Sequence, residues 1–335
     1  MNEPFQDPDI LEIVSRTNNL PYQGVTAVIT GGAGFLGSTM SEVLLELGAS
    51  VLCVDNLSSG RMENISRLVK RAGFEFIHHD ISKPLEIDRK VDYIFHMASR
   101  ASPLEFTEYP IQILKSNTLG TWNALGMAKK HGARVLFTST SEIYGEAAIF
   151  PTPETYRGNV NTLGIRGCYD EAKRAGEAYC MAYHRQHGID VRIVRIFNTY
   201  GPRMRSDGVY GRVIPRFIDQ AQNNQHITIF GDGSQTRSFC YVTDQVTGLL
   251  NLAGREGLAG EVVNIGNPHE YTVSELAGII IRLIGSSSDL SYEPLPQDDP
   301  MRRFPDISKA VRLLNFEYRI GLEEGLLRMI ERLYA

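Results

Sequence analysis

The 335-residue chain has few cysteines, no excess of basic residues and no long apolar run. Cys53, Cys168, Cys180 and Cys240 stand singly, without CxxC spacing or nearby histidine pairs, so the sequence predicts neither a metal site nor a disulfide framework. The formal net charge of -5 argues against a nucleic-acid partner, because such binding needs a concentrated excess of Lys and Arg. No apolar stretch approaches the roughly 18–20 residues that a membrane helix needs.

The remaining composition is that of an ordinary folded protein. Hydrophobic residues make up 42% and charged residues 22% of the chain. Its length fits a nucleotide-binding domain with a smaller partner region, and the unpaired cysteines suit a reducing cytoplasm. Residues 1–24 carry acidic side chains where a secretory signal has basic and then apolar ones, so we expect an N-terminal arm there, with one helix over 8–16.

From Val25 onward, short apolar runs alternate with helical patterns. This alternation predicts an α/β fold, a Rossmann-like doubly wound parallel sheet that binds its ligands at the carboxyl ends of the strands. The rhythm breaks after Asn198, so we expect one domain over 25–197 and a smaller, mixed α/β substrate-binding region over 198–335, with some later segments free to rejoin the first. The predicted strands are VTAVIT, SVLCVD, FEFIHHD, VDYIFHMAS, ARVLFTSTS and VRIVRIFN.

The stretch TGGAGFLGS follows the first predicted strand and is typical of a dinucleotide site. Gly31, Gly34 and Gly37 permit a tight turn and let a pyrophosphate approach the backbone amides. Asp55 closes the second strand, where a carboxylate binds an adenosine ribose and repels a 2′-phosphate, so NAD is favoured over NADP, although Arg61 is compatible with a phosphorylated ribose. The other predicted cofactor contacts are Phe35, Leu36, Asn56, Asp80, Ile81 and Ala98. Asp80 is almost as typical of a helix start.

Three further residues predict the chemistry. Tyr169 and Lys173 stand four apart on a predicted helix, so their side chains share one face, and the ammonium can favour the phenolate form of a phenol with an ordinary pKa of ~10. Thr140 ends another predicted strand and therefore lies at the same crevice. The alternative is a chance pair on a helix surface, which the neighbouring glycine motif disfavours.

This combination resembles the Thr/Tyr/Lys set of the short-chain dehydrogenase/reductase family. Longer blocks resemble its extended branch, the nucleotide-sugar epimerases, dehydratases and decarboxylases, and in order and spacing they are most similar to the UDP-glucuronate decarboxylase group. The chain departs from that pattern at Arg100, Ile165 and Ala172 and in its N-terminal arm. The blocks are TGGAGFLGS, ASRASP, TSTSEIYGE, RGCYDEAKR, RIFNTYGPRM, GDGSQTRSF, NIGNP and QDDPMRRFPDISKA.

The resemblance implies decarboxylation of UDP-glucuronate to UDP-xylose through a 4-keto sugar, with NAD regenerated in each cycle. Tyr169 and Lys173 then also contact the cofactor. Glu142 would handle a proton or water, although a structural carboxylate is the alternative. A serine, Ser141, stands where related 4,6-dehydratases have an acid, so dehydration is disfavoured and a substrate contact is expected. The remaining implied substrate contacts, for the diphosphate, are Asn198, Arg237 and Arg303.

Other functions stay open at this point. Either arginine, Arg237 or Arg303, taken alone is more typical of a solvated surface charge. A UDP-glucuronate 4-epimerase would use the same Tyr and Lys, and a non-catalytic NAD-sensing regulator would keep the fold without the chemistry. The resemblance also suggests a homodimer formed by the helix after Asn117 and the helix of Tyr169. Cys168 lacks a positioned His, so a nucleophile is not expected.

Overall fold

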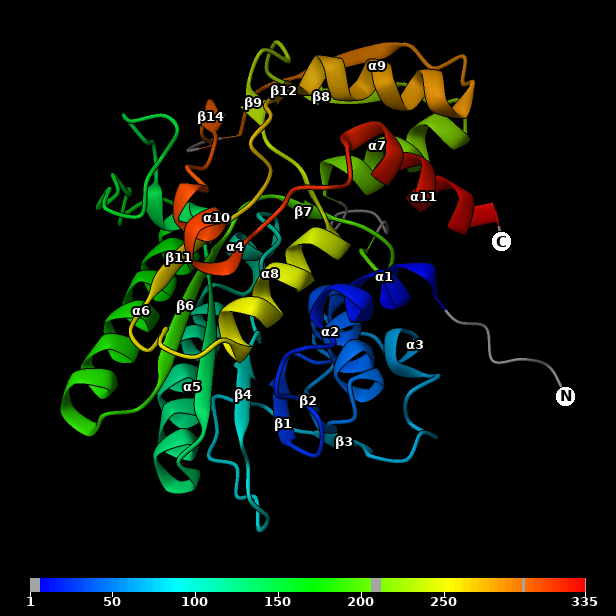
Figure 1. Ribbon diagram of the computed structural model, residues 1–335. Helices are drawn as coiled ribbons and strands as arrows, with labels where there is room; N and C mark the ends of the chain where they lie inside the picture. The colour runs from blue at the N-terminus through cyan, green and yellow to red at the C-terminus, as the bar shows by residue number, and fades with distance from the viewer. Residues whose placement is uncertain (1–6, 206–211, 297–298, 335) are drawn as a thin grey trace, which may run out of the picture.

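The computed structural model describes residues 7–205, 212–296 and 299–334, and its centre is a seven-stranded parallel sheet (Figure 1). The strand order is β11-β6-β5-β4-β1-β2-β3, and the order reverses between β4 and β1, which creates the crevice typical of a doubly wound sheet. The predicted fold class is confirmed. The strands are β1 (Thr26–Thr30), β2 (Ser50–Asp55), β3 (Phe74–His78), β4 (Tyr93–His96), β5 (Arg134–Thr140), β6 (Val191–Ile196) and β11 (Val262–Ile265).

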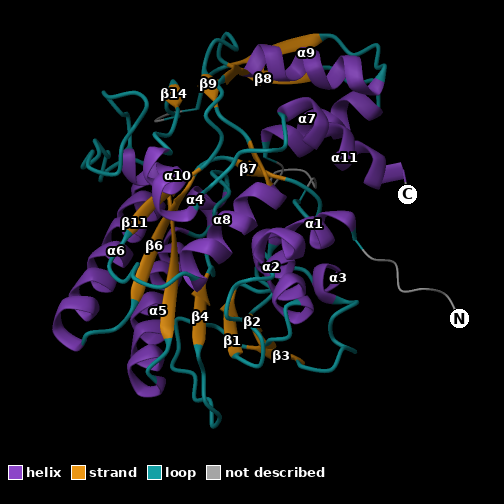
Figure 2. Ribbon diagram, viewed as in Figure 1, coloured by secondary structure: helices purple, strands orange, loops and turns teal. Residues whose placement is uncertain are grey.

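Helices cover both faces of this sheet (Figure 2). Successive side chains of a strand point to opposite faces, so a strand that is buried on both sides must be apolar throughout. In β1, Ala27 and Ile29 pack into one core and Val28 packs into the other. The first core includes α2 (Phe35–Glu46) and α8 (Val242–Gly254); the second includes α5 (Pro110–His131) and α6 (Gly167–His187).

The N-terminal arm contains the predicted helix, α1 (Pro8–Thr17). It begins with Asp7, whose side chain accepts a hydrogen bond from the Asp9 amide, and with Pro8 in its first turn, which are both common helix-start features. Its buried Ile10 and Ile13 belong to the first core, and the helix packs against α8 and α2. The arm is therefore part of the main body.

The smaller region lies above the sheet in Figure 1 and contains several short elements. Its chain returns to the main sheet once, because β11 pairs in parallel with β6. The helices above the sheet are α7 (Val213–Gln222), α9 (Val273–Ile284) and α11 (Leu322–Tyr334), whereas α10 (Ser308–Leu314) packs against β11 and α8. The strands are β7 (Thr199–Tyr200), β8 (Ile227–Phe230), β9 (Thr236–Arg237), β10 (Cys240–Tyr241), β12 (Tyr271–Thr272), β13 (Leu290–Glu293) and β14 (Arg302–Arg303).

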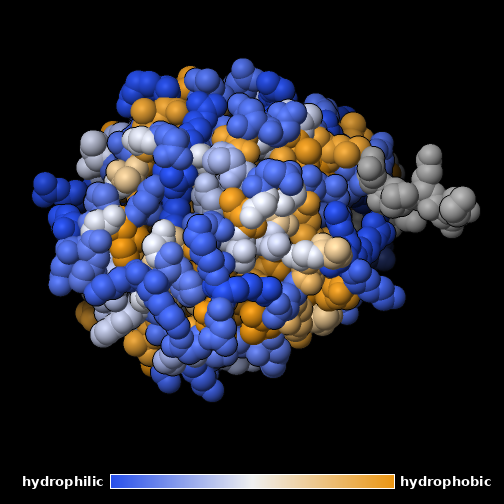
Figure 3. All heavy atoms as spheres, turned by 60° about the horizontal axis from the view of Figure 1, so that its bottom comes forward, coloured by the Kyte–Doolittle hydropathy of each residue, from blue (hydrophilic) through white to orange (hydrophobic). Residues whose placement is uncertain are grey.

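The surface mixes polar and apolar side chains. On the face that Figure 3 views, hydrophilic residues are interspersed with smaller apolar areas. None of the helices in the described ranges combines the length and the apolar character needed to cross a bilayer.

Candidate active site

A cavity of about 920 Å³ lies at the carboxyl ends of the central strands, where the smaller region meets the sheet. Segments that follow each of the strands β1 to β6 line it, as do residues of α7 and β9 together with Pro296, Asp299 and Pro300. All of the sequence-predicted site residues line this cavity except Arg303, which lies behind Glu142. This volume lies at the upper end of the range of small-molecule and cofactor pockets.

The glycine turn between β1 and α2 forms one end of the cavity. Gly31 has a φ of +72°, and a Cβ on it would lie 2.8 Å from Ala98 Cα. A Cβ on Gly37 would lie 2.2 Å from the Gly31 carbonyl oxygen. Gly34 precedes α2 without any side-chain cap, so the first amides of the helix keep no side-chain acceptor. The turn is thus built for close approach of an anion to the helix N-terminus.

Asp55 stands at the end of β2 beside this turn. Its Oδ2 accepts a hydrogen bond from the Ala33 amide at 3.0 Å and its Oδ1 accepts one from the Leu57 amide at 2.8 Å. Burial raises the pKa of this carboxyl, and the hydrogen bonds from Leu57 and Ala33 oppose that change. A carboxylate oxygen has more than one lone pair, so Asp55 retains acceptor capacity for ribose hydroxyls. The glycine turn and Asp55 together fit an adenine dinucleotide without a 2′-phosphate.

Asp80 does not start a helix. Its Oδ1 accepts a hydrogen bond from the Ser82 amide at 3.0 Å, which is an Asx turn, and the next residues form a turn and loop. The helix-start alternative is wrong for this residue. Asp80 and Ile81 both line the cavity, as does Asn56, so the predicted cofactor contacts after β2 and β3 are close to one another.

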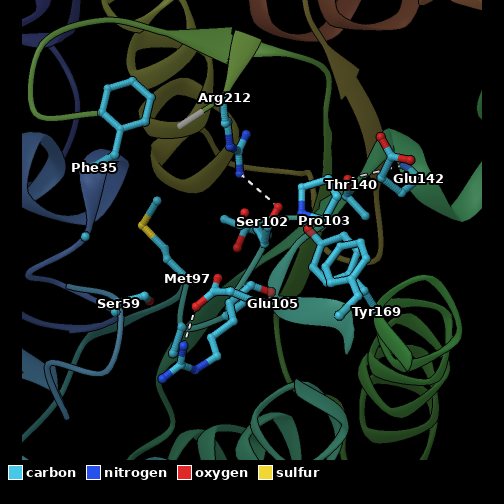
Figure 4. A pocket seen from close by; sticks show the side chains of 18 of the residues that line it. Phe35, Ser59, Met97, Ser102, Pro103, Glu105, Thr140, Glu142, Tyr169 and Arg212 are labelled. Carbon is cyan, nitrogen blue, oxygen red and sulfur yellow. Dashed lines mark hydrogen bonds and ion pairs between the residues drawn. The ribbon is translucent and has the colours of Figure 1, made fainter. Parts of the chain in front are cut away.

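Thr140, Tyr169 and Lys173 meet at one wall of the cavity, where Figure 4 shows the first two side by side. Thr140 ends β5, and Tyr169 and Lys173 occupy the first turns of α6. Burial raises the pKa of Tyr169 to about 12, while the Arg212 guanidinium and a hydrogen bond with Thr140 partly offset this. Burial also lowers the pKa of Lys173 to about 7.

The lysine is bonded to the backbone and not to the phenol oxygen. Lys173 Nζ donates a hydrogen bond to the Thr138 carbonyl oxygen at 2.7 Å and lies 6.0 Å from the centroid of the Tyr169 ring. The ammonium is nevertheless on the same side of α6 as the phenol, as the spacing predicts. A small side-chain movement, or a ligand hydroxyl between them, would connect the two groups.

Glu142 lies between two arginines. Its Oε2 accepts hydrogen bonds from Arg303 Nη2 at 3.0 Å and from Arg166 Nη2. Burial disfavours ionisation, but the Arg303 and Arg166 guanidinium groups outweigh it and hold the pKa of Glu142 well below its usual range. The carboxylate is therefore ionised at neutral pH and is suited to orient a water molecule, while its low pKa makes it a weak proton acceptor.

The two predicted arginines of the smaller region are neighbours because of strand pairing. β14 pairs in parallel with β9, and this register sets Arg303 opposite Arg237. Arg237 Nη2 donates a hydrogen bond to Asp299 Oδ2 at 3.0 Å, and Arg303 also donates to the Gly145 carbonyl oxygen. Both side chains are buried, so neither is a solvated surface charge.

Ser141 and Asn198 occupy the same wall. Ser141 begins the 3-10 helix η1 (Ser141–Tyr144) directly after β5, and Asn198 follows β6. The Asn198 carbonyl oxygen accepts a hydrogen bond from the Cys240 amide at 2.8 Å, which ties the end of the sheet to β10. Both residues line the cavity.

Sequence reasoning missed four charged residues near the site. Arg212 precedes α7, contacts the Ala101 carbonyl oxygen at 3.4 Å and faces the cavity (Figure 4), but no motif marks it.

Arg166 and Asp170 flank Tyr169 within a sequence block that resembles the family, and this position was a signal by which they could have been predicted. Burial and the Glu142 charge raise the pKa of Asp170. Asp299 approaches Arg166 at 3.8 Å as well as Arg237.

Comparisons with known proteins agree with this geometry. The chain is 47% identical over 319 residues to UDP-glucuronic acid decarboxylase 1 of Arabidopsis thaliana, covering 94% of this chain and 72% of that protein. It is 47% identical over 304 residues to the Danio rerio protein of the same name, covering 91% and 71%. A crystal structure of UDP-glucuronic acid 4-epimerase from Bacillus cereus with UDP-glucuronic acid and NAD matches with a TM-score of 0.82 at 28% identity, over 92% and 100% of the chains.

Residues 27–266 match the NAD dependent epimerase/dehydratase family. This match spans the glycine turn, the Thr140, Tyr169 and Lys173 set, and the strand β11 that completes the sheet. The resemblance that the sequence motifs indicated is thereby confirmed, and the chain belongs to the NAD dependent epimerase/dehydratase family.

Proposed function

We propose that this protein is an NAD-dependent enzyme that converts UDP-glucuronate to UDP-xylose and CO2. The observation that carries the proposal is the junction, in one cavity, of the Thr140, Tyr169 and Lys173 set with a wall built around Arg166 and Arg237. The acid–base pair Tyr169 and Lys173 is then adjacent to cations that suit a nucleotide sugar with an anionic diphosphate and an anionic carboxylate. Relatives named UDP-glucuronic acid decarboxylase at 47% identity support the same choice.

The residues that would hold NAD are those at the glycine end of the cavity. The amides of the Gly31–Gly37 turn would bind the pyrophosphate, and Asp55 would accept hydrogen bonds from the adenosine ribose. Lys173 would bind the other ribose. The chemistry that NAD supplies when bound is a reversible hydride acceptor for C4 of the sugar. We accordingly propose 25–197 as the NAD-binding domain and 198–335 as mainly the nucleotide-sugar domain, with β11 in the central sheet.

Tyr169 is the proposed base. Its phenolate, which needs cationic charge beside it to offset the burial that raises the pKa of Tyr169, would take the proton of the C4 hydroxyl as hydride leaves C4 and that carbon becomes a ketone. The Thr140 hydroxyl would donate a hydrogen bond to the same oxygen. The C5 carboxylate is now β to a ketone, so its C–C bond breaks to release CO2 and the electron pair remains in an enolate. After protonation at C5 and reduction at C4, Tyr169 returns its proton to the C4 oxygen. The cycle consumes no external reductant.

Glu142 is the proposed residue for proton handling at C5. Its carboxylate is held ionised by Arg303 and Arg166, so it would orient a water that protonates C5 and would not itself be the proton donor in this arrangement. Arg237 is proposed to bind the diphosphate, with Asn198 beside it. For Arg237 to do so, the anionic substrate must take over from Asp299, its present partner.

We also propose a homodimer through α5 and α6. Large apolar side chains on α5 remain exposed at Ile111, Leu119 and Trp122, and their spacing sets them on one helical stripe. The free thiols in the described chain suit a cytoplasmic setting. Light scattering of the purified protein measures the mass that distinguishes a dimer from a monomer.

The test is product analysis by mass spectrometry after incubation with UDP-glucuronate and NAD. We expect CO2 and a UDP-pentose, with no net NADH. The Tyr169→Phe variant should lose about 10²- to 10⁴-fold in rate while it still binds NAD, because only the proton-transfer step is removed. Retention of all six sugar carbons would reject decarboxylation.

Two other outcomes would point to the competing functions. Formation of UDP-galacturonate would support a 4-epimerase, which the Bacillus cereus structural relative exemplifies. A protein that binds NAD but converts no UDP-sugar, and whose cellular role survives Tyr169→Phe, would support a regulator. Including UDP-glucose, UDP-galactose and dTDP-glucose in the same assay covers the other nucleotide sugars.

A further inference from the structure

An aromatic ring stacks on the proposed base. The ring centroids of Phe106 and Tyr169 are 5.2 Å apart and their planes differ by 15°. Phe106 is 3% exposed and Tyr169 is 7% exposed, and together with Ile113 they form a small apolar cluster that is separate from the main cores. Offset stacking at this separation is a favourable aromatic arrangement. One face of the phenol is therefore covered by protein.

The ring of Phe106 belongs to a very short helix, α4 (Glu105–Glu108), at the cavity wall. A one-turn helix has little stability of its own and has no side-chain cap here. Its conformation must therefore be held by contacts with other segments. The Cys168 thiol, next to Tyr169 in sequence, makes one weak contact, to the Phe106 carbonyl oxygen at 3.8 Å.

A buried ion pair supplies the stronger contact. Glu105 is 2% exposed, and its Oε1 accepts a hydrogen bond from Arg100 Nη1; Figure 4 shows the dashed line at Glu105. The Arg100 guanidinium also lies 4.2 Å from the centroid of the Tyr109 ring, which follows α4. Arg100 thus contacts residues at both ends of α4, the short helix that carries Phe106. Such a pair is costly to break from one side, because the other charge is left buried.

Phe106 also contacts Arg166, which belongs to the charged wall of the cavity formed by Glu142, Arg166, Arg237, Asp299 and Arg303. The Arg166 guanidinium carbon lies 5.6 Å from the centroid of the Phe106 ring, and Arg166 also binds Glu142. Phe106 is thus in contact with the proposed base and with an arginine that fixes Glu142. A phenol acts as a base only when its oxygen is within hydrogen-bonding reach of the substrate hydroxyl, and small misplacements are costly in rate.

We propose that Phe106 is a positioning residue for Tyr169, and that the Arg100–Glu105 ion pair holds Phe106 in place. The inference rests on the proposed function, which makes Tyr169 the base. Arg100 is one of the positions where the chain departs from the block pattern of the decarboxylase group that it resembles.

The experiment follows the Tyr169 phenol directly. Protein labelled with ¹³C at tyrosine Cζ is titrated by NMR, and Tyr169→Phe assigns the resonance, so the readout needs no turnover. In Phe106→Leu we expect water to reach the phenol and its pKa to fall from the burial-raised value, with kcat reduced by about 10-fold or more and KM nearly unchanged. Phe106→Tyr, which keeps a ring at this position, should restore both quantities.

Two further variants complete the design. Arg100→Met keeps the Phe106 ring and removes the ion pair, so it should shift the same titration in the same direction by a smaller amount. Phe76→Leu is the matched control, because Phe76 is a partly buried phenylalanine on β3 whose ring neighbours His78 and which does not line the cavity. It should leave the Tyr169 titration and kcat unchanged.

The outcomes separate this inference from the proposed function. An unchanged Tyr169 titration and a kcat within about twofold of wild type in both Phe106→Leu and Arg100→Met would overturn the positioning role. An equal effect of Phe76→Leu would also overturn it. A wild-type protein that leaves UDP-glucuronate intact would refute the proposed substrate, while the titration would still report whether Phe106 controls the phenol.

Discussion

The two ends of the cavity differ in what forms their surface, which is mainly backbone at one end and mainly charged side chains at the other. At the cofactor end, close-packed backbone forms the surface: the glycine turn, the first amides of α2, and a carboxylate, Asp55, that bonds two further amides. At the proposed substrate end, side-chain charges form the surface and are paired with one another, as Glu142 is with Arg166 and Arg303. The backbone of the first end is fixed by close packing, whereas the charges of the second are held by their partners.

This difference has an energetic consequence. The backbone of the glycine turn cannot relax around an added atom, because main-chain atoms cannot rotate away as a flexible side chain can. A charged wall can reorganise, but each buried charge that loses its partner incurs a desolvation cost. Substitutions at the cofactor end should therefore act sharply on ligand binding. Those at the substrate end should act on stability in a pH-dependent way.

The largest expected effect is at the glycine turn. In Gly37→Ala the new Cβ would lie 2.2 Å from the Gly31 carbonyl oxygen, so the turn must open. We expect the Kd for NAD, measured by calorimetry, to rise by about 10- to 100-fold, as an overpacking cost of about 1.4–2.8 kcal/mol implies. Gly126→Ala is the control, since nothing in the described structure beyond the backbone of its own helix lies within 4 Å of the added Cβ. Equal affinities in the two variants would contradict a preformed cradle.

An intermediate effect is expected at the charged wall. Glu142→Gln keeps the shape of the side chain but leaves Arg166 and Arg303 without their shared carboxylate. Loss of a charge-assisted hydrogen bond at this partly buried site should lower the free energy of unfolding by about 1.5 kcal/mol at pH 7. Urea denaturation of both proteins measures it. Glu75→Gln, at an exposed pair with Arg89, controls for the simple loss of a carboxylate.

The direction of the Glu142 pKa shift determines how this difference in the free energy of unfolding should change with pH. The folded-state pKa of Glu142 is depressed below its ordinary 4.5, so the stabilisation is fully present above pH 4.5 and is lost as the pH falls toward the folded-state pKa. The stability difference between wild type and Glu142→Gln should therefore shrink between pH 7 and about pH 3.5. A difference that stays constant or grows in that range would show that the carboxylate is not held ionised by the arginines.

The same division explains what the sequence could predict. The proposed cofactor end depends on residues close in sequence, so the motif and its spacing predict Gly31, Gly37 and Asp55, which all line the cavity. The charged wall joins four segments of the chain. The sequence predicts its members Glu142, Arg237 and Arg303 but not Arg166 or Asp299. Nothing local in the chain specifies that Arg303 stands opposite Arg237, because that follows from the pairing of β14 with β9.

The end of β4 also depends on tertiary contacts that the sequence pattern does not predict. The apolar run VDYIFHMAS predicted a strand longer than the observed β4, which ends at His96. The Met97 amide still donates to the Thr30 carbonyl oxygen at 3.1 Å, but it and the Ala98 amide also donate to the Thr30 hydroxyl oxygen at 3.2 Å, where the chain turns toward the cavity. His96 supports the turn with its own bond to that hydroxyl at 2.7 Å. These are contacts with β1, which apolar periodicity does not report.

The smallest expected effect is at an exposed ion pair, and it tests whether burial is what distinguishes the charged wall. Arg71 and Glu46 are 2.6 Å apart, but both side chains are 36% exposed, so water competes for each charge. Arg71→Met should change the free energy of unfolding by less than about 0.5 kcal/mol, with little pH dependence. Urea denaturation under the conditions used for Glu142→Gln makes the values comparable. If the exposed pair contributed as much as Glu142, distance alone would set the strength of these pairs, and burial would not explain the behaviour of the cavity wall.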